Sequence, residues 1–199
     1  MKSLVFVLTT IACFSITFLI PSLEGYEKFL FIFACSCGAL SLLVFKEPII
    51  QFKTIHARWV VYAVIAGVVY ACIKLLLKVF LLKHPIEPDP ISLIMLLDIL
   101  LITCLLSPFL EELFFRGVLF DDLRKKWGVI AAITVTSILF LAIHINNYHE
   151  SRLVESLLLM LPGIMLYVYF KLKTNNFLVS TATHIAHNTT LFIFFTIFW

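Results

Sequence analysis

Long apolar blocks constrain the fold of this sequence more than any other feature. Crossing about 30 Å of hydrocarbon takes roughly 20 helical residues. Blocks of about that length recur between short polar breaks, at residues 3–23, 28–45, 59–82, 91–120, 128–145, 153–170 and 177–199. Hydrophobic residues make up 62% of the chain and charged residues 14%, whereas soluble domains are about 45–50% apolar and about 25% charged. We therefore predict an all-α, polytopic integral membrane protein of about seven transmembrane helices.

Lys and Arg residues fall unequally on the two sides that seven spans would create. The N-terminus and the breaks at 46–58, 121–126 and 171–176 share one side, which carries most of them. Cytoplasmic loops carry the excess of basic residues, so we predict a cytoplasmic N-terminus in the cell membrane. Block 3–23 lacks a small-residue cleavage site and is expected to stay as a helix. The net charge of +3 then reflects topology, and no nucleic-acid partner is expected.

A few ionisable side chains interrupt the apolar blocks. Such groups are costly inside a membrane and tend to mark functional sites. They are Asp98, Glu111, Glu112, Arg116, His144, Glu155, His184 and His187, with the strongly hydrogen-bonding Asn188 beside the last of them. Their positions therefore direct the search for a site.

The first motif reads Glu111-Glu112-Leu-Phe-Phe-Arg116-Gly117. On a helix, Glu112 and Arg116 are four residues apart and meet on one face, so the guanidinium can neutralise Glu112. Glu111 points about 100° away from that face, which leaves its carboxylate available as a general base. The alternative interpretation is a structural ion pair, with Glu111 facing water near the membrane edge.

Two further motifs carry histidines. Phe140 and His144 lie one helical turn apart in the fifth block, and His184 and Asn188 do so in the last block, with His187 partly to one side. A lone histidine on an apolar helix is more often a packing residue than a catalyst. The last pair also fits ordinary interhelical hydrogen bonding. Neither motif alone therefore predicts an enzyme.

Spacing predicts that the three motifs lie at one depth. The fourth and fifth blocks form a helical hairpin that turns near residues 127–128, with 16 residues separating Glu111 from 127 and 16 separating 128 from His144. His184 and Asn188 lie roughly 12–18 Å past the preceding polar break, and Glu111 about 15 Å past its own, at the helical rise. We therefore expect these groups to line one polar cavity in the cytoplasmic half of the membrane.

Prolines and one polar segment complicate this arrangement. Pro108 and Pro162 can each kink a helix and free a carbonyl. Asp98 is expected to hydrogen-bond a neighbouring helix. If His144 lies only as deep as the spacing predicts, residues 146–152 follow too soon for an outer loop. Either the fifth helix extends past the cytoplasmic surface, or this segment enters a wet cavity.

Together the motifs resemble those of the CPBP intramembrane endopeptidases, which include type II CAAX prenyl proteases and bacteriocin-processing or immunity proteins. Their motifs are two glutamates followed by arginine, then Phe-x-x-x-His, then His-x-x-x-Asn or Asp. The matching residues, in the same order, are Glu111-Glu112 with Arg116, Phe140 with His144, and His184 with Asn188. The resemblance covers residues 91–199 as a catalytic core, while residues 1–90 match only as N-terminal membrane helices.

The resemblance implies a peptide-bond hydrolase whose helices surround a polar cavity. It implies that Glu111 and His144 activate a water, and that His184 and Asn188 stabilise the oxyanion or help to bind a metal. The supporting residues that it implies are Glu112, Arg116 and Phe140. The expected partners are the lipid bilayer and a membrane-associated peptide or protein, prenylated or not.

Two histidines and a carboxylate, namely His144, His184 and Glu111, are also a set that can hold zinc and leave a position for water. The His-Glu-x-x-His helix of many zinc peptidases is absent from the sequence. A divalent metal cofactor is therefore left open beside a metal-free, glutamate-type mechanism.

Two other functions fit parts of the pattern. A non-catalytic membrane immunity or interaction protein would keep the polar cluster for packing. A small transporter would use the glutamates and histidines as a proton relay, but the sequence shows no inverted repeat and no pair of broken helices in matching halves. The combined motifs favour the intramembrane endopeptidase.

Overall fold

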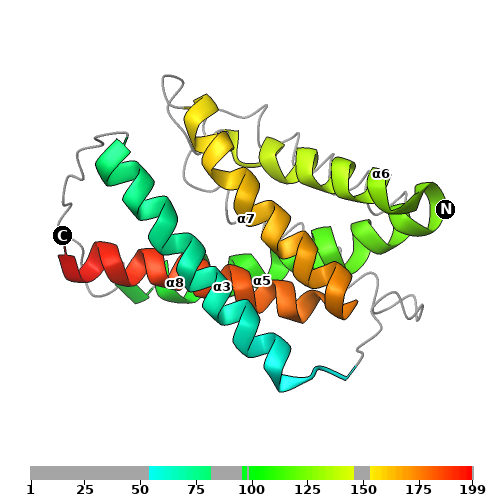
Figure 1. Cartoon of the computed structure of the whole chain (residues 1–199), viewed down its shortest axis with the longest axis horizontal. Coiled ribbons are helices and arrows are strands. Elements are labelled where there is room, and N and C mark those ends of the chain that lie inside the picture. Colours follow the sequence, from blue (N-terminus) through cyan, green and yellow to red (C-terminus); the bar gives the residue numbers. More distant parts are fainter. Residues whose placement is uncertain (1–53, 82–95, 98, 146–152, 199) are drawn as a thin grey trace.

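A computed structural model describes residues 54–81, 96–97, 99–145 and 153–198, which are almost entirely helical (Figure 1). This part of the chain contains no strand. The all-α prediction is therefore confirmed for it, and the last five predicted blocks coincide with its helices. Predictions for blocks 3–23 and 28–45, for Asp98 and for the course of 146–152 fall outside the described residues.

Helix α8 (Phe177–Phe198) lies at the centre of the described bundle. It packs against α3 (Ala57–Leu76), which continues as the π-helical η2 (Leu77–Leu81), and against α7 (Leu153–Thr174). On another side it contacts the helical stretch over 99–119. Figure 1 shows α3 and α8 crossing near their middles. Since α8 touches so many neighbours, several of its polar side chains, including His184 and His187, are buried between helices.

Residues 99–127 form one continuous helical stretch of changing type. The π-helical η3 (Ile99–Leu106) leads into α5 (Ser107–Glu112), the π-helical η4 (Leu113–Leu119) and α6 (Phe120–Ala142). π-Helical segments are rare and are frequent at functional sites. Here they flank the short α-helical turn that carries the two glutamates. Pro108 lies in the first turn of α5, where the hydrogen-bonding pattern changes from π to α.

The polar break at 121–126 was expected to be a loop between two spans, and this expectation is wrong because these residues stay helical. Within this segment Lys126 pairs with Asp122 at 2.7 Å, four residues apart, and Asp121 pairs with Lys171 of α7 at 2.8 Å. Both aspartates of this segment are therefore paired with lysines while the chain remains helical. The chain turns back at Gly128, whose φ of 86° and ψ of 174° favour glycine. This confirms the turn predicted near 127–128.

Close contact between α3 and α8 depends on Gly67. A Cβ atom at this position would lie 2.3 Å from the carbonyl oxygen of Thr183 and 3.0 Å from the Cβ of Ala186. Small residues let membrane helices approach in this way. The crossing brings α3 against the histidine-bearing segment of α8.

The described bundle buries a polar cluster within an apolar core and exposes large apolar side chains. Two of its helices are long and apolar enough to cross a membrane, at Ala57–Val79 and Leu153–Thr174. Large apolar side chains of α3 face outward, with Val61 53% and Ile65 54% exposed. The buried set also includes Glu112 and Arg116, both at 0% exposure. Buried ionisable groups together with exposed apolar side chains suit a lipid environment.

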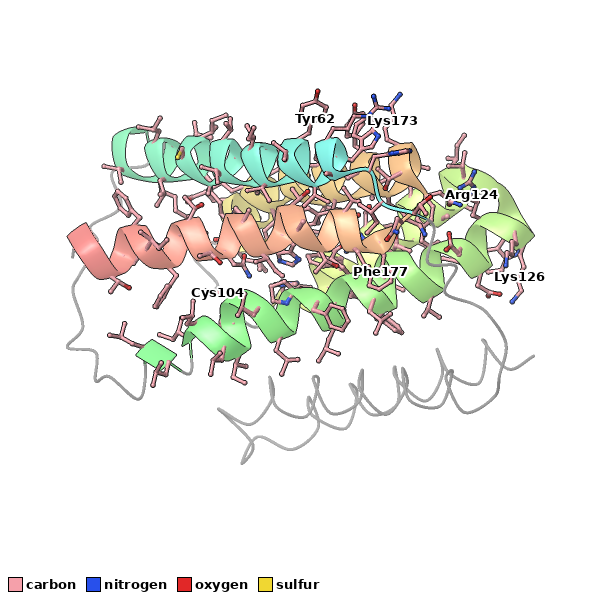
Figure 2. All side chains as sticks on the ribbon, turned by 90° about the horizontal axis from the view of Figure 1, so that it is seen from below. Tyr62, Cys104, Arg124, Lys126, Lys173 and Phe177 are labelled. Atoms are coloured by element: carbon pink, nitrogen blue, oxygen red, sulfur yellow. The ribbon has the colours of Figure 1, made fainter. Side chains whose placement is uncertain are left out.

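Basic side chains gather at one end of the bundle. Figure 2 shows Arg124, Lys126 and Lys173 at the same end, where α6 begins and α7 finishes. The ion pair between Lys171 and Asp121 joins the same two elements. The segments 121–126 and 171–176, which the sequence placed on one side of the membrane, therefore do lie together.

Candidate active site

The site begins with a buried ion pair on the central helical stretch. Arg116 Nη1 lies 3.1 Å from Glu112 Oε1, and neither side chain is exposed. The contact predicted from their four-residue spacing is confirmed. The guanidinium carbon also lies 4.5 Å from the ring centre of Phe140 and 5.6 Å from that of Tyr167. Aromatic faces attract a desolvated cation, so Arg116 is held by charge and by rings.

His184 of α8 joins this pair from across the helix interface. Its Nδ1 lies 3.2 Å from Glu112 Oε1, and its Nε2 lies 4.0 Å from Glu111 Oε2. A carboxylate oxygen only accepts hydrogen bonds, so Nδ1 carries the proton toward Glu112. The histidine therefore presents Nε2 to Glu111, a residue 73 positions earlier in the chain.

Glu111 is buried at 7% exposure but only half satisfied. The hydroxyl of Ser107 donates to its Oε1 at 2.6 Å. Its Oε2 has no hydrogen-bond partner among the described residues. A buried carboxylate oxygen without a partner is costly. That oxygen instead faces His184 Nε2 at 4.0 Å.

His144 lies just after the end of α6, whose last residue is Ala142. Its ring stacks on Phe140 at a centroid distance of 4.8 Å, and its Nδ1 lies 2.7 Å from the Phe140 carbonyl oxygen. Their predicted common face is therefore confirmed. The carbonyl can only accept, so Nδ1 donates and the neutral ring keeps a lone pair on Nε2. Glu111 and His184 lie within electrostatic range of this ring.

Phe140 connects the three motifs. Besides Arg116 and His144, its ring faces His184 at a centroid distance of 6.0 Å. The structure thus brings one residue of each motif to a single aromatic ring. The contact of Glu111 with His184 agrees with their matched depths, whereas the common polar cavity stays a prediction.

Asn188 is oriented differently from its partner in the third motif. Its amide nitrogen donates to the Thr103 carbonyl oxygen of η3 at 3.1 Å, and its Oδ1 lies 3.0 Å from His187 Nδ1. Asn188 thus contacts η3 and its own neighbour, while His184 contacts the glutamates. An amide has two N–H groups, so the second remains for another acceptor.

Two residues of the cluster were missed in the sequence. Ser107 precedes Glu111 by one helical turn, so the four-residue rule that was applied to Glu112 also applies to this pair. Tyr167 is 3% exposed and its ring stacks on His184 at 4.5 Å. The signal for Tyr167 is weaker, since it is only a tyrosine in the middle of an apolar block.

The residues do not fit a metal centre as they are placed. In the described ranges, no group of three or more His, Cys, Asp or Glu side chains is arranged to hold a metal ion. This includes the set Glu111, His144 and His184. We therefore derive no step through a metal.

A pocket of about 350 Å³ lies between α3 and α7. Its walls are mainly apolar, with Tyr70 and Lys74 as exceptions, and Pro162 and Leu159 line its α7 side. The Tyr70 hydroxyl donates to the Leu159 carbonyl oxygen, three residues before Pro162. The bond ties α3 to α7 beside this proline, but the carbonyl that Pro162 leaves without an N–H partner in the helix is that of Leu158.

Comparison with known protein families identifies a match over the second half of the chain. A family model described as type II CAAX prenyl endopeptidase Rce1-like matches residues 93–190. This segment includes every residue of the three motifs. No curated protein and no solved structure matches the chain significantly.

Proposed function

The chain belongs to the type II CAAX prenyl endopeptidase Rce1-like family, and on that premise we propose that it is an intramembrane endopeptidase. Its substrate is a membrane-associated peptide or protein, and the reaction is hydrolysis of a peptide bond. One observation carries the proposal: the unpartnered Oε2 of buried Glu111 faces Nε2 of His184 at 4.0 Å. A water beside these atoms would be held by both.

In this mechanism Glu111 is the general base. Its Oε2 takes a proton from the water as the oxygen attacks the scissile carbonyl carbon. Ser107 holds Oε1, so the carboxylate presents its other oxygen to the water. His144, with Nε2 unprotonated in the neutral ring, is the second group that activates water. Proton transfer by a positioned side chain contributes about 10²–10⁴-fold in rate.

His184 and Asn188 stabilise the charge that develops on the carbonyl oxygen. In its charged form His184 donates from Nε2 while Nδ1 stays on Glu112. Asn188 supplies the amide N–H that is not used by Thr103. Preorganised donors of this kind often account for more of the rate enhancement than any other group in an active site. Glu112 supports His184 and is itself neutralised by Arg116.

A purely structural cluster is less well supported. Burial without a hydrogen-bond partner does not by itself separate the two functions, because the Ser137 hydroxyl shares that property among the described residues. Glu111 differs in that its Oε2 faces a histidine nitrogen from another helix at 4.0 Å. A carboxylate and an imidazole that face each other in this way can act together on a water, which favours catalysis.

We also propose that the protein spans the membrane several times, with about seven helices and the N-terminus in the cytoplasm. The supporting observation is the clustering of Arg124, Lys126 and Lys173 at one end of the bundle (Figure 2). An excess of basic residues marks the cytoplasmic side. The active site would then be approached by substrates from within the membrane or from that side.

The proposal is tested by reconstituting the protein in liposomes with a set of membrane-inserted peptides and identifying products by mass spectrometry. The wild type should produce defined internal cleavages, and His144→Ala should lower their rate by about 10²-fold or more. His56→Ala is the control, since His56 is exposed and precedes α3. Equal cleavage by wild type and His144→Ala would contradict the proposed role of His144.

A further inference from the structure

Two tyrosine rings lie against two histidine rings inside the bundle. Tyr167 of α7 stacks on His184, with ring centroids 4.5 Å apart and planes inclined by 19°. Tyr70 of α3 stacks on His187, with centroids 4.6 Å apart and an inclination of 27°. The Tyr167 hydroxyl lies 3.4 Å from His187 Nδ1 and links the two pairs. Three helices therefore meet in one layer of rings beside the glutamates.

Tyr167 is itself held from several directions. The hydroxyl of Ser180 donates to its backbone carbonyl at 2.7 Å and ties α8 to α7 at this level. The Arg116 guanidinium carbon lies 5.6 Å from its ring centre. The side chain is only 3% exposed. In a close-packed interior such a ring has little room to move, so it offers a fixed plane to its neighbour.

His184 needs such a plane because one hydrogen bond leaves its orientation underdetermined. Its Nδ1 is tied to Glu112 Oε1 at 3.2 Å, but the last side-chain torsion of histidine has a broad energy profile. A ring stacked against the imidazole restricts rotation about that bond. The hydrogen bond and the stack together direct Nε2 to Glu111 Oε2.

We propose that Tyr167 is a positioning residue for His184, and that its ring rather than its hydroxyl performs this role. The hydroxyl contact with His187 is long at 3.4 Å and so contributes weakly. Aromatic pairs of this geometry attract beyond their burial. The kinetic consequence rests on the proposed endopeptidase function, whereas the contact itself does not.

Two substitutions separate ring from hydroxyl. Tyr167→Phe keeps the ring and should leave kcat close to that of the wild type. Tyr167→Leu keeps apolar volume without a ring and should lower kcat by about tenfold to a hundredfold, with KM little changed. Tyr169→Leu, at an exposed position of the same helix, is the matched control and should leave kcat unchanged.

Wild-type kcat in Tyr167→Leu would overturn the proposal, and so would equal losses in the Phe and Leu variants. If Tyr167→Leu does not fold, Tyr167→Met takes its place, because its flexible side chain fills irregular gaps. The same outcomes then decide the proposal.

A double-mutant cycle tests the contact without any substrate. Thermal unfolding midpoints are measured for the wild type, Tyr167→Leu, His184→Gln and the double variant. Residues in contact couple, so the double variant should lose less than the sum of the single losses. Additive losses would overturn the contact. Coupling in a protein that cleaves no peptide would instead refute the proposed function and leave the stack in place.

Discussion

Glu111 and Ser107 lie one helical turn apart on α5, and that spacing decides how the carboxylate is presented. The serine holds Oε1 at 2.6 Å, so Oε2 is left facing His184. A hydrogen bond to a charged group contributes about 1.5–3 kcal/mol, which is enough to fix a side chain that must meet a water. The neighbouring Glu112 carries a different task, because Arg116 has already neutralised it.

Removing the serine hydroxyl should therefore impair catalysis more than stability. We expect Ser107→Ala to lower kcat/KM by about tenfold, the rate equivalent of about 1.4 kcal/mol, as measured by peptide cleavage in liposomes. Ser137→Ala is the matched control, since the buried Ser137 hydroxyl has no hydrogen-bond partner among the described residues. Unchanged cleavage by Ser107→Ala would show that the serine does not orient Glu111.

At this scale the sequence predicts individual contacts within one helix, but between helices it predicts only a common depth. The pairs Glu112 with Arg116 and Phe140 with His144 follow from a four-residue spacing. Tyr167 reaches His184 only because α7 packs on α8, and no spacing in the sequence encodes that packing. The shared role of the motif residues was expected through a family resemblance; their catalytic roles remain predictions.

The positions of the helices show which sequence-based predictions of secondary structure are correct. Block length predicted the described helices, and the turn at Gly128 followed from its place between the fourth and fifth blocks. The charged residues of 121–126 were expected to interrupt the helix. These residues continue the helix instead, because Asp122 pairs with Lys126 and Asp121 pairs with Lys171 of α7. The π-helical segments around α5 have no simple periodic signature and could not be expected.

The packing of α3 against α8 is sensitive to substitution of Gly67. An added methyl group would meet the Thr183 carbonyl oxygen at 2.3 Å, so α3 and α8 would have to separate. We expect Gly67→Ala to lower the free energy of unfolding by about 1–3 kcal/mol, measured by thermal or denaturant unfolding in detergent. Gly117→Ala is the control, because its Cβ would meet only side chains at 3.4 Å. Equal stability of both variants would contradict the close crossing.

Over the described part of the molecule, the ionisable motif residues are buried and large apolar side chains of α3 are exposed. The length of the apolar blocks predicts a membrane protein, since few other folds can accommodate them. The sequence did not predict that α8 would be central, because that place depends on close contacts such as Gly67 with Thr183 and Ser180 with Tyr167. The predicted polar cavity and the seven-helix count are not settled by the described residues and remain predictions.

The predicted orientation leads to a labelling experiment. In a background without the native cysteines, Lys125→Cys should react with a membrane-impermeant maleimide only after the cells are permeabilised. Lys83→Cys, which the charge pattern puts on the other side, should react in intact cells. The physical reason is the retention of basic residues in the cytoplasm. Labelling of Lys125→Cys in intact cells would contradict the orientation.

The central claim is that the buried carboxylate of Glu111 is the base of a peptidase, and Glu111→Gln tests it most directly. This change keeps shape and removes the charge. Cleavage of the peptides that the wild type processes should fall by about 10²-fold or more. The thermal unfolding midpoint should shift no more than it does in the control variant Asp122→Asn, which removes a carboxylate charge outside the site. Wild-type cleavage rates in a folded Glu111→Gln protein would contradict the account.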